Sequence, residues 1–291
     1  MAIPPGSTDS PAAVFCRGRK LELEHPRIMG VLNVTPDSFS DGGRLMSRGR
    51  VDVERVVAAA HAMIAEGAAI LDVGGESTRP GSLPVAVADE CSRVIPVIER
   101  LSELDTIVSV DTSKPEVARL ALQAGCHLVN DVTGLRDPGM RKVVAEADAA
   151  ACVMHMRGEP RSMQNEPVYK DVVAEVRAFL EERVGACDEA GIDRQRLLLD
   201  PGIGFGKRLE HNLALLRNLE GLRFAGLPVL VGVSRKSMLG ALTERPVTDR
   251  DAMSAVAAAL AVEHGASVVR THDVGLTADA LKLVTAWHGH G

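Results

Sequence analysis

The sequence predicts a single (β/α)8 barrel with a short N-terminal hairpin, on the strength of two observations. After a hairpin expected at 14–25, the 291-residue chain alternates eight short apolar runs with longer segments of helical periodicity. The eight repeating units average about 33 residues each, which suits a barrel of typically about 250 residues. Polar sequences follow nearly every apolar run, and a parallel barrel gathers all of those ends on one face.

The expected strands are short, β-branched runs bounded by polar segments. In order they cover 27–34, 69–77, 106–112, 127–132, 150–156, 196–204, 228–234 and 267–274. The expected helices are amphipathic stretches whose Ala and Leu content favours helix. They include 51–66, 86–104, 114–124, 171–190, 211–219 and 251–264.

A doubly wound sheet is the alternative architecture. It is disfavoured because no G-x-G-x-x-G follows the first expected strand, and because the polar segments follow most strands rather than gathering at one switch point. No internal linker rich in Pro, Gly or Ser divides the chain. We therefore expect a flexible leader over 1–13 and one barrel domain over 14–291.

Composition argues against two kinds of partner. A net charge of −6 and only seven aromatic residues (5 Phe, 1 Tyr, 1 Trp) argue against nucleic acid. The longest apolar run, 255–262, is far shorter than the roughly 20 residues of a membrane helix. The five cysteines have no C-x-x-C spacing, which argues against a disulfide framework or a thiolate zinc site, and the N-terminus has no secretory pattern. These features predict a cytoplasmic protein.

Four charged or amide side chains stand at four expected strand ends. They are Asp111, Asn130, Asp200 and Lys236. Buried without partners they would cost several kcal/mol, so they either brace the barrel as a buried network or bind a ligand. The combination suits a planar heterocycle with donors and acceptors along one edge, such as a pterin or a purine.

A second group suits an anion. Arg270 and His272 alternate with Thr271 on the last expected strand and therefore point the same way. Asn33, at the end of the first strand, is their neighbour in a closed barrel, and its amide oxygen suits Mg²⁺ bound to phosphate oxygens. The alternative is that Arg270 caps a helix or pairs with Asp273.

Glycines at 202, 204 and 206 precede Lys207, but their spacing does not match the P-loop pattern. We expect them to allow close approach of a flat ligand, with Phe205 as an apolar wall. Ser237 opens the helix after the seventh strand, where it could hold a carboxylate or serve as an N-cap. Segments 35–43 and 76–82 resemble lids, and His155 is expected to lie in the core or pocket wall rather than to act as a ligand.

Together these segments resemble the dihydropteroate synthase family of folate biosynthesis, over about 15–287. The matching stretches are 29–43 (Met-Gly-Val-Leu-Asn-Val-Thr-Pro-Asp-Ser-Phe-Ser-Asp-Gly-Gly), 72–81, 109–112, 130–131, 200–207, 234–237 and 270–273. The resemblance implies a transferase in which p-aminobenzoate displaces pyrophosphate from 6-hydroxymethyl-7,8-dihydropterin diphosphate, with Mg²⁺, giving 7,8-dihydropteroate. It also implies a homodimer and sensitivity to sulfonamides.

The resemblance assigns residues to three parts of the site. Asp111, Asn130, Asp200 and Lys236 would hold the pterin, while Asn33 (through Mg²⁺), Arg270 and His272 would hold the diphosphate. The p-aminobenzoate side would comprise Phe39, Thr78, Arg79, Pro80, Phe205 and Ser237.

For the chemistry itself, Arg270 would stabilise the leaving group, and Asp111, with Asp41 from the first lid, would offset positive charge on the pterin methylene. Two alternatives are a pterin-dependent methyltransferase barrel and a non-catalytic pterin-binding protein.

Overall fold

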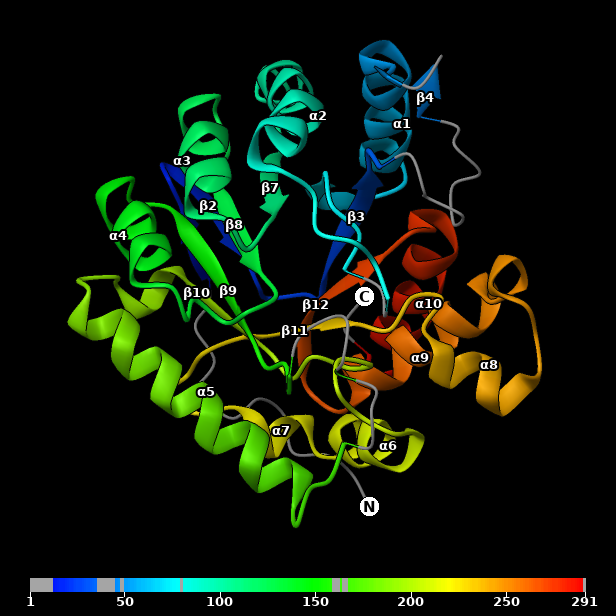
Figure 1. Ribbon diagram of the computed structural model, residues 1–291. Helices are drawn as coiled ribbons and strands as arrows, with labels where there is room; N and C mark the ends of the chain where they lie inside the picture. Colours follow the sequence, from blue (N-terminus) through cyan, green and yellow to red (C-terminus); the bar gives the residue numbers. More distant parts are fainter. Residues whose placement is uncertain are drawn as a thin grey trace.

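A computed structural model describes residues 13–35, 45–47, 50–78, 81–158, 163 and 167–289. Within them eight parallel strands close into a barrel in the order β10-β11-β12-β3-β6-β7-β8-β9, which confirms the predicted fold (Figure 1). The barrel strands are β3 (Arg27–Asn33), β6 (Ala68–Gly74), β7 (Ile107–Asp111), β8 (Leu128–Asp131), β9 (Ala150–Met154), β10 (Leu197–Asp200), β11 (Val229–Gly232) and β12 (Ala266–Thr271).

Helices surround the barrel on the outside (Figure 1). They are α1 (Val53–Ala65), α2 (Val87–Leu101), α3 (Pro115–Gln123), α4 (Pro138–Glu146), α5 (Val172–Glu189), α6 (Leu209–Arg217), α7 (Leu219–Leu222), α8 (Ser237–Thr243), α9 (Asp251–Glu263) and α10 (Val274–Trp287). The six helices named from the sequence are all present, as is α8, the helix expected to open at Ser237, whereas α4, α7 and α10 had not been named individually. None of the helices in the described part of the chain combines the length and the apolarity needed to cross a membrane.

Smaller elements complete the described chain. A hairpin of β1 (Ala13–Cys16) and β2 (Arg19–Glu22) precedes the barrel, and a second short antiparallel pair is formed by β4 (Met46–Ser47) and β5 (Arg50–Val51). Short 3-10 helices span Arg194–Arg196 and Val247–Asp249. The expected leader falls almost entirely outside the described residues.

The N-terminal hairpin closes the amino end of the barrel. Val14 and Leu21 face each other across its two strands, and with Cys16 they are almost completely buried. They pack on the inward-facing residues at the amino ends of the barrel strands, among them Ile107 and Leu128. The lower layer of the interior is therefore apolar, and the polar inward-facing residues lie above it, toward the carboxyl ends.

Several strands are shorter than the apolar runs predicted for them, because they end several residues before those runs end. The run 196–204, for example, supplies only Leu197–Asp200 as strand β10. Pro201 has no N–H for the ladder, and the Asp200 carboxylate accepts a hydrogen bond from the Gly202 N–H at 2.7 Å, which turns the chain away from the sheet. The segments beyond these strand ends thus surround the mouth of the barrel instead of extending it.

We predict that Leu21→Ala lowers the free energy of unfolding by about 2–5 kcal/mol, because the substitution leaves a cavity between the hairpin and the barrel floor. Urea denaturation measures this change, and Lys20→Ala, at a half-exposed neighbouring side chain, is the matched control. An equal loss of stability in both variants would show that the hairpin does not act through packing.

Candidate active site

A cavity of about 530 Å³ opens at the carboxyl ends of the barrel strands. It is lined by all ten of the predicted site residues that the structure describes, namely Asn33, Thr78, Asp111, Asn130, Asp200, Phe205, Lys236, Ser237, Arg270 and His272. The other four predicted residues, Phe39, Asp41, Arg79 and Pro80, lie outside the described residues. Seven of the eight barrel strands, or the segments that follow them, thus bring these ten residues from across the sequence to one pocket, as the barrel prediction requires.

Arg270 is the centre of a buried ion network on the cavity floor. Its Nε donates to Asp72 Oδ2 at 2.6 Å, and its Nη2 donates to Asp111 Oδ2 at 2.8 Å. Asn130 Nδ2 donates to the same Asp72 oxygen at 3.0 Å. The alternative prediction that Arg270 pairs with Asp273 is wrong, because the Asp273 side chain instead accepts from Leu276 N and caps α10.

The sequence analysis assigned no role to Asp72. This residue is fully buried, and one of its oxygens accepts hydrogen bonds from both Arg270 and Asn130. Its side chain therefore fixes two predicted ligand-binding groups relative to each other. The sequence did contain a sign of this role, because Asp72 is a charged residue in an otherwise apolar strand, and a buried charge needs a partner.

Asp111 has an unusual electrostatic environment. Burial raises its pKa to about 7, as do the carboxylates of Asp72 and Glu90, and the nearby Arg270 guanidinium opposes the increase. While Oδ2 binds Arg270, Oδ1 is buried without a hydrogen-bond partner in the described part of the structure. Because buried polar atoms normally have partners, this oxygen is suited to accept an N–H from a ligand.

Asp200, at the end of β10, and Lys236, in the turn after the neighbouring strand β11, both line the cavity. Burial raises the pKa of Asp200, and the Gly202 N–H and the Lys236 charge oppose that shift. Lys236 Nζ lies 4.1 Å from the centre of the Phe205 ring, a cation–π contact that places an aromatic surface beside an ammonium group. Phe205 thus presents an apolar ring to the cavity, and Lys236 presents a hydrogen-bond donor beside it.

The glycines at 202 and 206 serve a different purpose from the one predicted. A side chain at Gly202 would meet the His155 carbonyl oxygen at 1.9 Å, and one at Gly206 would meet the Arg157 carbonyl at 2.5 Å. Both glycines also have positive φ angles. They allow the loop to pack on the chain that follows β9, so the close approach is to the protein's own backbone rather than to a flat ligand.

Lys207 holds this loop in place. Its buried ammonium donates to the carbonyls of Gly202 and Phe205 at 2.9 and 3.0 Å and lies 2.9 Å from His155 Nδ1. Burial lowers the pKa of Lys207 to about 7 and that of His155 to about 2. His155 is therefore a buried, neutral residue of the core, one of the two places predicted for it, and Lys207 supports the backbone that carries Phe205.

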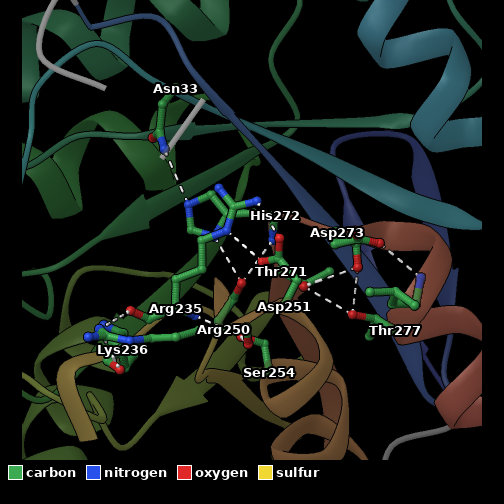
Figure 2. Close-up of polar contacts among 12 residues, drawn as sticks. Asn33, Arg235, Lys236, Arg250, Asp251, Ser254, Thr271, His272, Asp273 and Thr277 are labelled. Carbon is green, nitrogen blue, oxygen red and sulfur yellow. Dashed lines mark hydrogen bonds and ion pairs between the residues drawn. The ribbon is translucent and has the colours of Figure 1, made fainter. Parts of the chain in front are cut away.

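His272 lies just beyond β12, which ends at Thr271, yet it lines the cavity beside Arg270 as predicted. Asn33 and His272 point toward each other, with Asn33 Nδ2 and His272 Nε2 3.5 Å apart (Figure 2). Ser234, which the sequence analysis did not select, orients the ring because its Oγ lies 2.9 Å from His272 Nδ1. This contact uses the Asn33 amide nitrogen, and the amide oxygen is the atom of this side chain suited to a cation.

The turn between β11 and α8 places Lys236 and Ser237. Arg235 pairs with Asp251, its Nε and Nη2 lying 2.6 and 2.9 Å from the two carboxylate oxygens (Figure 2). Ser237 is the first residue of α8, as predicted, but Lys236 occupies the N-cap position and makes no side-chain capping bond. Ser237 is therefore not the N-cap.

The residues present suit a magnesium ion that is bound mainly through a substrate. No group of three or more Asp, Glu, His or Cys side chains within the described ranges could hold a metal by itself. Mg²⁺ commonly takes one or two protein oxygens together with substrate phosphates and waters, and the Asn33 amide oxygen can supply such a ligand beside Arg270 and His272.

Comparison with known proteins agrees with this geometry. Residues 29–272 match the family described as "Pterin binding enzyme". The chain is 47% identical over 274 residues to dihydropteroate synthase of Escherichia coli (strain K12), an alignment that covers 94% of this chain and 95% of the relative.

Solved structures give the same result. The chain resembles Burkholderia cenocepacia dihydropteroate synthase complexed with 7,8-dihydropteroate, with a TM-score of 0.86, 44% identity and coverage of 96% and 97% of the two chains. It resembles Xanthomonas albilineans dihydropteroate synthase with 4-aminobenzoic acid, with a TM-score of 0.86, 48% identity and coverage of 95% and 98%. The fold and cavity are thus those of a pterin-binding enzyme, and within that class the chain belongs to the dihydropteroate synthase family.

We predict that binding of a pterin without a diphosphate weakens as the pH falls from about 7.5 to about 5.5. Below its pKa of about 7, Asp111 takes up a proton and loses acceptor capacity, so the affinity falls by up to about tenfold for each pH unit. Calorimetric titration measures this slope. Asp111→Asn should bind weakly and flatten the profile, and a profile unchanged by that substitution would assign the titration to Asp200 instead.

Proposed function

We infer that the protein catalyses the dihydropteroate synthase reaction, a transfer in which the amine of p-aminobenzoate displaces pyrophosphate from 6-hydroxymethyl-7,8-dihydropterin diphosphate. The observation that carries this inference is one cavity that combines buried carboxylates with amide and cationic side chains, in a chain that belongs to this family. A new C–N bond forms at the pterin methylene as its C–O bond to the diphosphate breaks, and the amine releases one proton.

The pterin ring is assigned to the floor of the cavity. The unpartnered Asp111 Oδ1 and the Asp200 carboxylate are acceptors for ring and amino N–H groups, and Lys236 is a donor for the ring oxygen or a ring nitrogen. Asn130 is bonded to Asp72 through one amide hydrogen, and its carbonyl oxygen can accept from the ligand. A flat ligand can also pack on Phe205.

The diphosphate is assigned to Asn33, Arg270 and His272. Arg270 is already held by two carboxylates, so its guanidinium is fixed before a ligand arrives and needs no reorganisation as negative charge grows on the leaving oxygen. Asn33 would hold Mg²⁺ together with the phosphate oxygens, and the ion when bound would neutralise leaving-group charge.

The p-aminobenzoate side is assigned to the cavity mouth. Thr78, Phe205 and Ser237 line this part of the cavity, and Phe39, Arg79 and Pro80 are proposed to complete it. The amine of p-aminobenzoate is neutral and nucleophilic, so the protein needs chiefly to align it with the methylene carbon and to exclude water. Asp111, with Asp41, would offset positive charge that develops on the pterin.

The test is the reaction itself, followed through both products. With Mg²⁺, pyrophosphate and dihydropteroate should form in equal amounts and only when p-aminobenzoate is present. Binding of the pterin diphosphate without either product would indicate a non-catalytic pterin-binding protein. Failure to bind it would overturn the assignment of the cavity.

We predict that Asn33→Ala and Arg270→Lys each lower kcat/KM by at least about tenfold. Arg270→Lys keeps the charge beside Asp72 and Asp111 and removes only the guanidinium geometry, so the melting temperature should change little. Asn33→Ala should in addition need more Mg²⁺ for half-maximal rate. Arg245→Ala, a half-exposed surface arginine, is the control, and unchanged kinetics in both site variants would contradict the assignment.

We also propose that the protein works as a cytoplasmic homodimer. The free cysteines need no oxidising compartment. For the dimer, α9 and α10 pack together, and each exposes large apolar side chains. Val256 and Leu260 lie one turn apart on α9, and α10 exposes Leu276, Leu283 (69% exposed) and Trp287 (81% exposed). Exposed apolar side chains on two packed helices support the proposal that these helices form the association site.

We expect Leu260→Glu to convert the protein from twice the 30.9 kDa chain mass to that mass itself, as measured by light scattering on a sizing column. The added carboxylate would be desolvated in the interface. Leu242→Glu, at an exposed leucine of α8, should leave the mass unchanged. A wild-type protein with the single-chain mass would refute the dimer.

A further inference from the structure

The segment between β6 and α2 carries Thr78 to the cavity mouth. Its first residues are pressed against α2, because a side chain at Gly75 would meet Val94 Cγ1 at 2.6 Å. Arg93 Nη1, also from α2, donates to the Gly75 carbonyl at 2.9 Å. Gly75, at the start of the segment, is therefore held against α2, the helix that follows the segment.

Lys114 links this segment to the next helix along the barrel. It stands at the N-cap position of α3, and its ammonium donates to Glu76 Oε2 and to Glu90 Oε2. The other Glu76 oxygen accepts from the Val85 N–H at 2.9 Å, which joins the two ends of the segment. One ammonium thus connects the β6–α2 segment, α2 and α3.

The charges make this link strong. The Glu90 side chain is fully buried, and that of Lys114 is only 21% exposed. Burial opposes the charge on Lys114, but the two carboxylates outweigh that effect and raise its pKa. Lys114 is the cation that compensates Glu90, since the remaining Glu90 oxygen is buried without a hydrogen-bond partner in the ranges described.

We propose that Lys114 is a positioning residue for the second substrate. Through Glu76 it holds the β6–α2 segment so that Thr78 keeps its place on the p-aminobenzoate side of the cavity. This inference rests on the proposed function, because it assigns that side of the cavity to p-aminobenzoate.

The Lys114 ammonium is bonded to Glu76 and Glu90 rather than to the residues assigned to the pterin. The chain between Asp111 and Lys114 is held through its backbone, with the Lys114 N–H donating to Thr112 Oγ1 at 3.2 Å and the Thr112 N–H donating to the Asn130 carbonyl at 3.1 Å. Asp111 itself is held by Arg270. Loss of the ammonium should therefore weaken the binding of p-aminobenzoate and leave the binding of the pterin diphosphate nearly unchanged.

The test compares Lys114→Met with Lys114→Arg, and uses Lys142→Met, at an exposed lysine of α4, as the control. For Lys114→Met we expect the KM for p-aminobenzoate to rise about tenfold, while calorimetric binding of the pterin diphosphate stays within about twofold of wild type. Lys114→Arg should restore most of the affinity, since it can still bind two carboxylates.

An equal change for both substrates, or no change for p-aminobenzoate, would overturn the proposal. Should Lys114→Met fold poorly, Glu76→Leu removes the same link while Lys114 still pairs with Glu90, and this variant must show the same selectivity. Direct binding of p-aminobenzoate in the presence of pyrophosphate and a pterin separates the role of Lys114 from the proposed reaction. If the wild type binds p-aminobenzoate but makes no dihydropteroate, the proposed reaction is wrong. The affinity of the Lys114 variant for p-aminobenzoate still decides the role of Lys114.

Discussion

The ion network of Arg270 with Asp72 and Asp111 is the interaction on which the site depends. Three carboxylates, those of Asp72, Asp111 and Asp200, are buried around the cavity floor, and Arg270 bonds to the first two. Burying such groups is costly unless they are paired, so the barrel can hold them only with the guanidinium in one position. The same constraint prepares the pocket for ligands, because it fixes charges and hydrogen-bonding atoms before a ligand binds.

Support for these groups comes from residues to which the sequence analysis assigned no ligand-binding role. Lys207 holds the loop of Phe205, Ser234 orients His272, and Asp72 joins Asn130 to Arg270. Each uses hydrogen bonds to position a residue that lines the cavity. The floor of the pocket is consequently built from paired groups, while its mouth is formed by segments beyond the strand ends.

The sequence predicted the barrel, and the convergence of polar strand-end residues on one cavity, because both depend on local, repeating signals, whereas Thr78 was assigned only through the family resemblance. An apolar run followed by polar residues marks a strand and its carboxyl end, and barrel closure brings those ends together. The roles of Asp72 and Lys114 were not predictable in this way. Each depends on partners from other units of the barrel, such as Arg270 for Asp72 and Glu90 for Lys114, and only the folded structure shows which side chains meet. The glycines at 202 and 206 were misinterpreted for the same reason, since their contacts are with the chain after β9.

The hairpin that seals the amino end of the barrel has a kinetic consequence. Val14, Cys16 and Leu21 close the floor, so the cavity at the opposite end of the barrel has no exit on that side. In the proposed arrangement, with the pterin on the floor and p-aminobenzoate at the mouth, the deeper substrate would enter before the outer one. The joined product would then leave from the same end of the barrel, opposite the hairpin.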